Sequence, residues 1–432
     1  MKTCAFYTLG CKVNQYETQS IRENFIKAGY EEKDFSRPCD VYVINTCTVT
    51  EKTDKESRRL IRKAHRQNPE AKIVVTGCYV ELDRAEISAI DGISFMIKNK
   101  DKDKIADIVD SKKTEPRLRP AAEYPEPGIS DFKDRSKAFL KIQDGCNNFC
   151  SYCKVPLVRG YSRSRSEEAV IAEAKRLLKK GFKEIVLTGI CLGAWGEEYT
   201  PKKSIESLLR KLTAIKGDFR IRLSSIEPKY VNNGLLGAIK RSPKICKHLH
   251  IPLQSGDDNI LKMMNRPYTF REYAKIVQNA RRKIPGIAVT TDILIGFPSE
   301  GSKNFQNTCK LIAKIRPSRI HIFPYSKREG TAASKLQGEL PKNIVAGRMK
   351  IMKALAEQYS YEFRKKFNGK TVKVLVEAER DKKTGLLKGY DDHYINVLIG
   401  GTLGKKNERY ISKVIPVRIQ KVDKELTLAS LI

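Results

Sequence analysis

The stretch of sequence that decides the fold reads Cys146-Asn147-Asn148-Phe149-Cys150-Ser151-Tyr152-Cys153. It comes just after a predicted strand, residues 138–143, and so forms a loop at the end of that strand. Thiolates are soft ligands that suit iron–sulfur clusters, zinc and copper(I). Three thiolates on one loop can hold three corners of a cubane cluster and leave the fourth iron open for a small chelating ligand. A structural zinc site would prefer four protein ligands, and no fourth Cys or His is close in the sequence.

Around this loop, strand and helix patterns alternate along the chain. Strand patterns occupy 138–143, 184–188, 220–224, 248–253, 288–294 and 319–323, with helical patterns between them, as at 167–180, 204–215 and 270–283. The series predicts an α/β core with a partial, open (βα) barrel; a doubly wound sheet is the alternative that periodicity leaves open. Active sites of such barrels lie at the C-terminal ends of the strands, where the cysteine loop falls.

The N-terminal stretch, about residues 1–98, predicts a parallel doubly wound sheet. Cys11, Cys47 and Cys78 each follow directly after one of its strand patterns. Parallel strands end at one edge of a sheet, where open α/β sheets bind their ligands, so these thiolates can converge on a second cluster. One such cysteine alone would be read as a small packing residue. Its sheet should also carry a helix at 81–90, and the charged, proline-containing residues 99–135 are predicted to be a linker.

The C-terminal part changes character after a long predicted helix, residues 343–367. Short strand patterns follow at 372–376, 386–390, 394–398, 411–419 and 425–428. They predict a small antiparallel β-barrel of roughly OB type.

The formal net charge is +33, from 83 Lys and Arg against 50 Asp and Glu. Such an excess usually serves a polyanion, with nucleic acid as the first candidate and an anionic membrane surface as the second. Within the helix at 52–67, Arg58, Arg62 and Arg66 stand at i, i+4 spacing and repel one another unless they face an anion, for which we favour RNA phosphate. No apolar run reaches membrane-spanning length and the N-terminus lacks a signal-peptide pattern, so we expect a cytoplasmic protein with reduced cysteines.

These motifs together resemble the radical-SAM methylthiotransferases, and the resemblance extends over the whole chain. The matching segments are Thr8 to Glu17, Asn45 to Thr50, the loop from Gln143 to Cys153, Val155 to Gly160, Ser162 to Arg165, Arg222 to Pro228, His250 to Gly256 and Thr291 to Pro298. One departure is Cys191, where a histidine would be expected. His321 is expected to be a packing residue.

The resemblance implies three domains: a methylthiotransferase N-terminal domain at 1–114, a radical-SAM core at 132–368 and a TRAM domain, an RNA-binding module, at 369–432. It implies two [4Fe-4S] clusters. The catalytic cluster on Cys146, Cys150 and Cys153 would make an adenosyl radical from S-adenosyl-L-methionine (SAM). The cluster on Cys11, Cys47 and Cys78 would present sulfur, which a second SAM methylates. Contacts to SAM are expected from residues at strand ends, namely Gly189, Ser225, Glu227, Gln254 and Ile295.

Within this family, the target is isopentenyladenosine in tRNA, an aspartate of a ribosomal protein, or N6-threonylcarbamoyladenosine 3′ of the anticodon. The strings Gly10 to Glu17 and Gln143 to Cys150 most resemble the bacterial form of the third branch, and the basic charge disfavours the ribosomal-protein branch. The expected partners are the anticodon stem-loop of tRNA, an electron donor such as flavodoxin or ferredoxin, and a sulfur source, with no membrane. The alternative of another class is an RNA-binding protein whose clusters are not catalytic.

Overall fold

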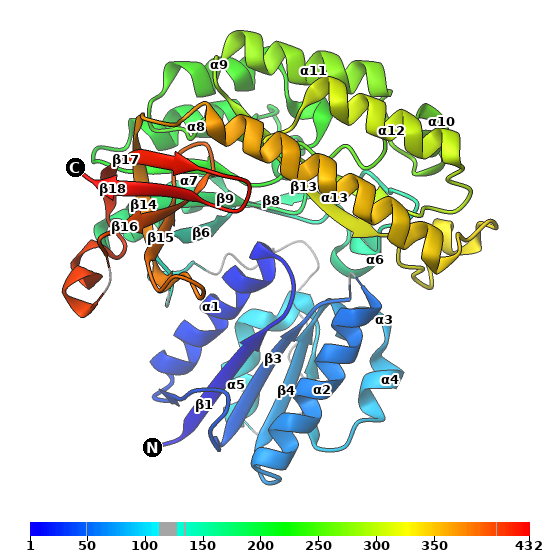
Figure 1. The fold of residues 1–432 in the computed structure, drawn as a ribbon. Coiled ribbons are helices and arrows are strands. Elements are labelled where there is room, and N and C mark those ends of the chain that lie inside the picture. Colours follow the sequence, from blue (N-terminus) through cyan, green and yellow to red (C-terminus); the bar gives the residue numbers. More distant parts are fainter. Residues whose placement is uncertain (49, 112–127, 134, 403) are drawn as a thin grey trace.

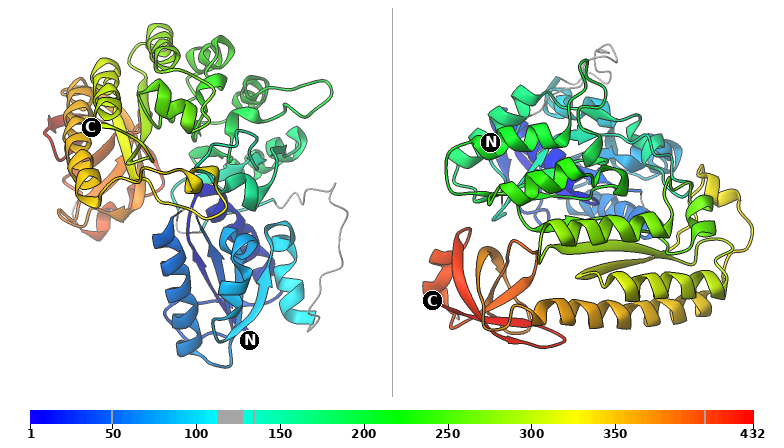
Figure 2. Two further views of the ribbon diagram at one scale, coloured as in Figure 1. Left: turned by 90° about the vertical axis from the view of Figure 1, so that its right-hand side faces the viewer. Right: turned by 90° about the horizontal axis from the view of Figure 1, so that it is seen from above.

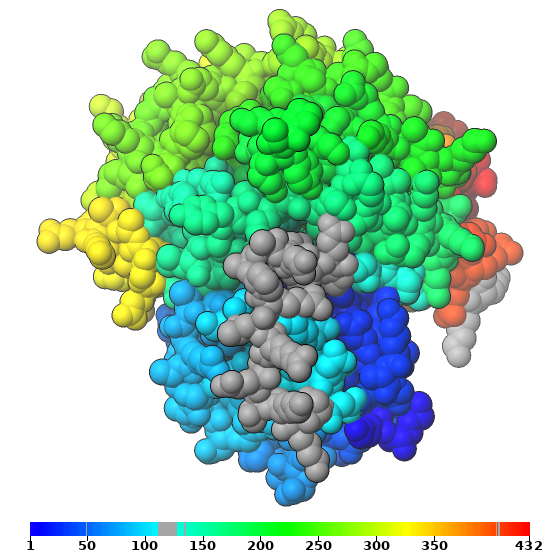
Figure 3. Space-filling view, turned by 180° about the vertical axis from the view of Figure 1, so that it is seen from behind, coloured from blue at the N-terminus to red at the C-terminus, as the bar shows by residue number. Residues whose placement is uncertain are grey.

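The computed structural model describes all of the chain except residues 49, 112–127, 134 and 403. Three sheet systems follow one another: a parallel sheet, a half barrel surrounded by helices, and a small closed barrel (Figures 1 and 2). Seen from behind, the N-terminal sheet domain lies below the half barrel (Figure 3). No helix among the described residues has the length and apolar character that a membrane crossing requires.

The N-terminal sheet has the order β2-β1-β3-β4-β5, and all its strands are parallel. Its strands are β1 (Thr3–Thr8), β2 (Glu31–Glu32), β3 (Val41–Thr46), β4 (Lys72–Gly77) and β5 (Ile93–Ile97). Successive side chains of β3 are buried on opposite faces, under α1 (Lys12–Lys27) and α5 (Ile105–Ser111) on one side and α2 (Glu51–Gln67) on the other. The predicted doubly wound arrangement is confirmed, because both faces of the strands are covered by helices.

Two expectations for this domain are wrong in detail. The single helix expected at 81–90 is two short helices, α3 (Cys78–Leu82) and α4 (Arg84–Ser88), because the backbone at Asp83 leaves the helical region (φ −115°, ψ 44°). The expected linker at 99–135 begins with a 3-10 helix, η1 (Asn99–Lys104), and α5, whose apolar residues belong to the core. Residues 112–127 and 134 of that segment lie outside the described part of the chain.

The half barrel contains six parallel strands in two hydrogen-bonded groups, β10-β9-β6 and β11-β12-β13, which isolated bridges connect at Ile221–Ile245 and Ser225–His250. The strands are β6 (Ala138–Lys141), β9 (Glu184–Thr188), β10 (Arg220–Leu223), β11 (His248–His250), β12 (Ala288–Ile295) and β13 (Arg319–Pro324). The partial, open barrel is thus confirmed over a doubly wound sheet, with β6 and β13 as its unpaired edges.

Helices cover the outer side of this arc (Figure 2). They are α7 (Glu167–Lys179), α8 (Ile205–Ala214), α9 (Asn233–Arg241), α10 (Asp258–Met263), α11 (Phe270–Lys283) and α12 (Ser302–Ile315). Local sequence sets their starts: Thr269 and Glu272 form a reciprocal capping box at α11. The cysteine loop leads into α6 (Val155–Arg159) and lies between the two short paired strands β7 (Gln143–Asp144) and β8 (Arg163–Ser164).

The chain then follows α13 (Lys342–Lys365) into a closed barrel of order β14-β15-β16-β18-β17. Its strands are β14 (Thr371–Arg380), β15 (Leu387–Tyr390), β16 (Asn396–Gly400), β17 (Val414–Val422) and β18 (Thr427–Leu431). The small barrel is confirmed, but one of its strand pairs, β16 with β18, is parallel rather than antiparallel.

This small barrel docks through the turn between β15 and β16. Arg220 donates hydrogen bonds to the carbonyls of Lys373 and Tyr390, and Arg222 donates to those of Asp391 and Asp392. Arg220 is the first residue of β10, so the contact lies at the N-terminal ends of the half-barrel strands. The small barrel therefore occupies the end of the half barrel opposite to the cysteine loop.

Candidate functional site

Each sulfur of the loop triplet accepts a hydrogen bond from an N–H group. The amides of Asn148 and Val155 donate to Cys146 and Cys153, both at 3.4 Å, and the Arg266 guanidinium donates to Cys150 at 3.2 Å. N–H donors stabilise a charged sulfur and tune the potential of a cluster that it ligates. The loop thus has the donor pattern that three thiolate ligands require.

The loop is held in place by neighbouring segments. A side chain at Gly145 (φ +71°) would place its Cβ 2.0 Å from the Tyr161 carbonyl oxygen, so only glycine fits. The Ser151 amide donates to the Met264 carbonyl at 3.0 Å, and the Ser151 carbonyl accepts from the Ala333 amide at 2.7 Å. The three sulfurs therefore sit on a fixed scaffold.

The second triplet lies where three neighbouring strands end. Cys11 follows β1, Cys47 follows β3, and Cys78 begins α3 directly after β4. Gly10 (φ +100°) allows a close approach, since a Cβ there would lie 2.9 Å from the Cys47 sulfur. Cys11 is exposed, whereas Cys47 and Cys78 are buried. The structure brings the three residues together at one sheet edge, as the sequence predicted.

A buried ionic network joins the two triplets. Arg159 contacts Glu17 at 2.7 Å and Asp144 at 3.1 Å, while Lys141 contacts both carboxylates at 2.7 Å and Lys102 contacts Glu17 at 2.5 Å. Although burial opposes it, the charges of Arg159 and its neighbours hold the pKa of Glu17 well below its usual range. For Asp144 the same balance, again led by Arg159, lowers the pKa to about 2.

Among the described side chains of this network, three cations face two carboxylates, an excess of one positive charge. The network acts on Cys78: burial raises the pKa of this thiol, and the charges of Arg159 and Lys102 oppose that rise. A buried charge requires a partner, and an anionic sulfur ligand at Cys78 would supply it. The surroundings of this triplet therefore fit an anionic cluster.

The spacing of the sulfurs argues against a single metal ion. Zinc bound tetrahedrally at about 2.3 Å from sulfur requires sulfurs about 3.8 Å apart. In the described part of the chain, three potential ligand atoms come within 4.8 Å of one another only at Asp391, Asp392 and His393. Neither cysteine triplet is so compact, which fits a group larger than one ion.

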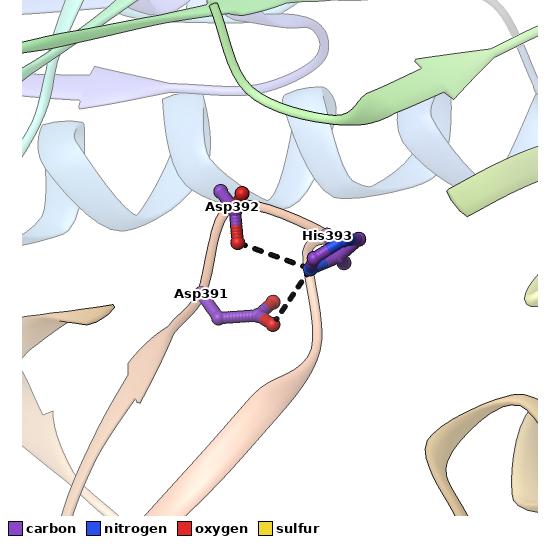
Figure 4. A group of neighbouring side chains, drawn as sticks. All are labelled: Asp391, Asp392 and His393. Carbon is purple, nitrogen blue, oxygen red and sulfur yellow. Dashed lines mark hydrogen bonds and ion pairs between the residues drawn. The ribbon is translucent and has the colours of Figure 1, made fainter. Parts of the chain in front are cut away.

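That compact group is an ion pair of the docking turn. His393 Nδ1 lies 3.2 Å from Asp391 and 3.0 Å from Asp392 (Figure 4). The other Asp391 carboxylate oxygen accepts the Ile395 amide at 2.7 Å. His393, whose pKa is raised to about 9, supplies the cation that pairs with both carboxylates.

The five residues predicted to contact SAM lie at or just beyond strand ends, on the side of the cysteine loop. Gly189 follows β9, and a Cβ at this position would lie 2.9 Å from the Gln143 side-chain oxygen. Gln254 has a left-handed backbone (φ +70°), a strained state for a residue other than glycine. Ser225 and Glu227 are partly exposed, and Ile295 is fully buried at the end of β12. Their contact with SAM stays a prediction.

The sequence did not predict the role of Arg266, which links a cysteine of the loop triplet, Cys150, with a residue expected to contact SAM, Glu227. Besides Cys150, its guanidinium pairs with Glu227 at 2.5 Å, and both side chains are largely buried. Nothing in the local sequence around Arg266 identifies it, because its partners lie on other loops. Cys191 adds a further thiol beside the loop triplet. Hydrogen bonding with Cys146 and burial raise the pKa of Cys191, and the Asn148 side chain donates to its sulfur at 3.8 Å.

Of the three arginines spaced along α2, namely Arg58, Arg62 and Arg66, only two are exposed to solvent. Arg58 pairs with Glu86 at 2.6 Å and donates to the Tyr79 hydroxyl at 2.6 Å, so its anion lies within the chain, contrary to the expectation for this residue. Arg62 and Arg66 are exposed.

Comparison with protein families gives two matches. Residues 3–97 match the family described as "Uncharacterized protein family UPF0004", and residues 140–312 match the "Radical SAM superfamily". The first range holds the strand-end triplet and the second holds the loop triplet.

Curated relatives match almost the whole chain. It is 40% identical over 430 residues to the threonylcarbamoyladenosine tRNA methylthiotransferase MtaB of Bacillus subtilis, covering 98% of this chain and 94% of that protein. Identity to the Thermotoga maritima protein of the same name is 37%, with 94% and 93% covered. The tRNA-2-methylthio-N(6)-dimethylallyladenosine synthase of Clostridium tetani is 32% identical, with 96% and 93% covered.

Solved structures share the fold at low identity. The radical S-adenosylmethionine methyltransferase TsrM from Kitasatospora setae gives a TM-score of 0.56 at 15% identity, covering 75% of this chain and 73% of that one. The cobalamin-dependent S-adenosylmethionine radical enzyme OxsB gives 0.52 at 12% identity, covering 84% and 58%. These likenesses bear on the fold alone.

Proposed function

This chain belongs to the radical-SAM tRNA methylthiotransferases, and from that premise we propose that it converts N6-threonylcarbamoyladenosine, 3′ of the anticodon, to its 2-methylthio derivative. Membership of the radical-SAM superfamily implies SAM and a [4Fe-4S] cluster. Cys146, Cys150 and Cys153 would hold this cluster, which would supply the electron for the reductive cleavage of SAM. A second cluster on Cys11, Cys47 and Cys78 is part of the proposal.

The observation that carries the proposal is that both cysteine triplets face one interface. α3, which begins at Cys78, packs against α6, which follows Cys153. Asn99 donates to the Val158 carbonyl at 3.0 Å, and Arg328 pairs with buried Asp54 at 2.5 Å. A substrate adenine in this interface lies within reach of both sites, as radical formation and sulfur delivery at one carbon demand.

Side chains around the two cysteine triplets stabilise and position the parts of the site. The N–H donors to the three loop sulfurs stabilise the thiolate form of the cysteines. Arg266 fixes the Glu227 carboxylate beside the expected SAM position. Arg159 and its carboxylates keep the two sites at a fixed separation and exclude water from between them. Gln143 accepts the Cys191 amide at 2.8 Å and donates to the Gly145 carbonyl at 2.8 Å, which ties the strand end after β9 to the cysteine loop.

The choice of target rests on the relatives. MtaB proteins reach 40% identity, against 32% for the dimethylallyladenosine synthase of Clostridium tetani, which defines the alternative substrate. Within the proposal, residues 1–114 form the methylthiotransferase domain, 132–368 the radical-SAM core and 369–432 a TRAM domain that binds RNA. We propose a cytoplasmic location, because the substrate is tRNA. The reaction also requires an electron donor and a sulfur source as partners.

The test uses anaerobically reconstituted enzyme, SAM, a reductant, sulfide and an anticodon stem-loop RNA with threonylcarbamoyladenosine. We expect 5′-deoxyadenosine and the 2-methylthio nucleoside by mass spectrometry. Changing Cys146, Cys150 and Cys153 together to Ala should abolish both products, since the radical originates there. Changing Cys11, Cys47 and Cys78 to Ala should abolish only the methylthio nucleoside.

Two results would contradict the proposal. If the second variant still formed the methylthio nucleoside, Cys11, Cys47 and Cys78 would be packing residues. If the intact enzyme modified only RNA containing dimethylallyladenosine, the alternative target would be correct.

A further inference from the structure

A layer of polar side chains lies inside the half barrel, one level below the strand ends. His250 on β11 contacts Asp292 on β12 at 3.1 Å and the Thr290 hydroxyl at 2.9 Å, and its ring packs against that of His321 on β13 at 5.4 Å. The interiors of (βα) barrels are usually filled by apolar, branched side chains. A polar layer in that position indicates a ligand rather than packing.

The layer is partly accessible to solvent. The side chains of His250 and Asp292 remain 16% and 22% exposed. Because β13 is an edge strand, the half barrel is open beside His321.

Lys12 belongs to the N-terminal domain and lies on a helix that packs against the half barrel. It is the first residue of α1, directly after Cys11, and α1 packs against β6, the other edge of the half barrel. One turn further on, Gln15 accepts from Arg135 and Tyr16 donates to Glu173, both in the central domain. Residues three and four apart share a helix face, so Lys12 lies on the face directed at that domain.

The charge of Lys12 acts on His321, one of the residues of the polar layer. Burial, then the charges of Arg319, His250 and Lys12, lower the pKa of His321 to about 4. His321 is therefore neutral at pH 7 and acts as an N–H donor, while Lys12 supplies a positive charge. Lys12 itself is exposed and has no ion pair among the described residues.

We propose that Lys12, with His321, binds the carboxylate of the threonylcarbamoyl group, while His250 holds Asp292 beside it. The inference rests on the proposed function and deepens it. The threonylcarbamoyl group bears a carboxylate and a hydroxyl, and Asp292 offers an acceptor to that hydroxyl. An apolar dimethylallyl group would offer no partner to Lys12 or His321, which a site built for hydrogen bonding disfavours.

The experiment compares two anticodon stem-loop RNAs, one with threonylcarbamoyladenosine and one whose threonine carboxylate is replaced by a carboxamide. For the intact holoenzyme, we expect the carboxylate RNA to bind about tenfold more tightly or better, as a charged hydrogen bond provides. Lys12→Met should remove most of this difference and raise KM more than it lowers kcat, and Lys12→Arg should restore part of it. Lys27→Met, at the far end of the same helix, is the matched control.

Further measurements keep the inference open to refutation. Iron content should be unchanged in Lys12→Met; if its clusters are lost, His321→Leu, remote from both triplets in sequence, should show the same loss of discrimination. Equal weakening of both RNAs would make Lys12 a general backbone contact, and weaker SAM binding would make its ligand the methionine carboxylate. Either result, or undiminished discrimination in both variants, overturns the inference. Absence of any product from the intact enzyme on the carboxylate RNA would instead refute the proposed function.

Discussion

Arg266 shows how one side chain coordinates two functions at the residue scale. It is buried and has its charge balanced by Glu227, so the arginine is held with one N–H directed at the Cys150 sulfur. Burial lowers and neighbouring acidic groups raise the pKa of this guanidinium, with a net rise, so its charge is permanent. The sulfur therefore always faces a charged donor.

We expect Arg266→Gln to lower SAM cleavage by about 10-fold to 100-fold, the usual cost of removing a group that orients a metal ligand. With the charged donor gone, the cluster should also become harder to reduce, and a redox titration followed by electron paramagnetic resonance should give a more negative midpoint potential. Arg282→Gln, exposed on α11, is the control. An unchanged potential would mean that Arg266 only supports the fold.

The cysteines and Arg266 differ in how far the sequence reveals them. Regular spacing identifies Cys146, Cys150 and Cys153, and strand-end position identifies Cys11, Cys47 and Cys78. The partners of Arg266 lie 39 and 116 residues away along the chain, so its role depends on the folded loops. His321 was likewise expected to be a packing residue, yet its ring faces His250 inside the half barrel.

At the scale of elements, most strands and helices follow from hydrophobic periodicity, and the exceptions have local causes. α3 begins at Cys78 because Gly77 (φ +102°) turns the chain sharply out of β4. The helix then stops at Asp83, and the Tyr79 hydroxyl donates to Glu86 of α4 at 2.5 Å. α5 was hidden within a charged, proline-containing segment, since its apolar face is short. Tertiary packing rather than propensity creates these elements.

The turn between β15 and β16 predicts a pH dependence. Burial alone would lower the pKa of His393, but hydrogen bonds from the ring to Asp391 and Asp392 outweigh it and raise the pKa to about 9. A histidine with a raised pKa stabilises the fold fully below its unfolded value of about 6.5. That stabilisation is lost as the pH rises through about 9.

We therefore expect docking of the small barrel to weaken between about pH 7 and pH 9.5. Urea unfolding followed by hydrogen exchange of the 391–395 turn should show the loss, and His393→Gln should have little further dependence in this range. His65→Gln, in the N-terminal domain, is the control. If intact protein and His393→Gln respond to pH alike, the ion pair does not hold the turn.

At the scale of the whole molecule, the three parts occupy distinct positions. The N-terminal sheet edge meets the cysteine loop at one end of the half barrel, and the small barrel meets Arg220 and Arg222 at the other. Removing residues 370–432 would expose both arginines and their buried partner Glu184, so truncation tests RNA binding poorly. Exposed charges are a cleaner probe of where a large polyanion docks.

The net charge of +33 predicts tRNA binding that weakens steeply with salt, because each phosphate contact releases condensed counterions. Arg62 and Arg66 are the exposed members of the α2 row, whereas Arg58 is committed to Glu86. Arg62→Glu with Arg66→Glu should weaken tRNA binding several-fold and flatten the plot of log affinity against log salt by about 1.5 units, while SAM cleavage stays unchanged.

Lys275→Glu with Arg282→Glu on α11, on the outer surface of the half barrel (Figure 1), is the matched control. Since both double variants change the net charge equally, a general field effect would weaken binding in both. Equal weakening, or none in the α2 variant, would exclude α2 as a docking surface.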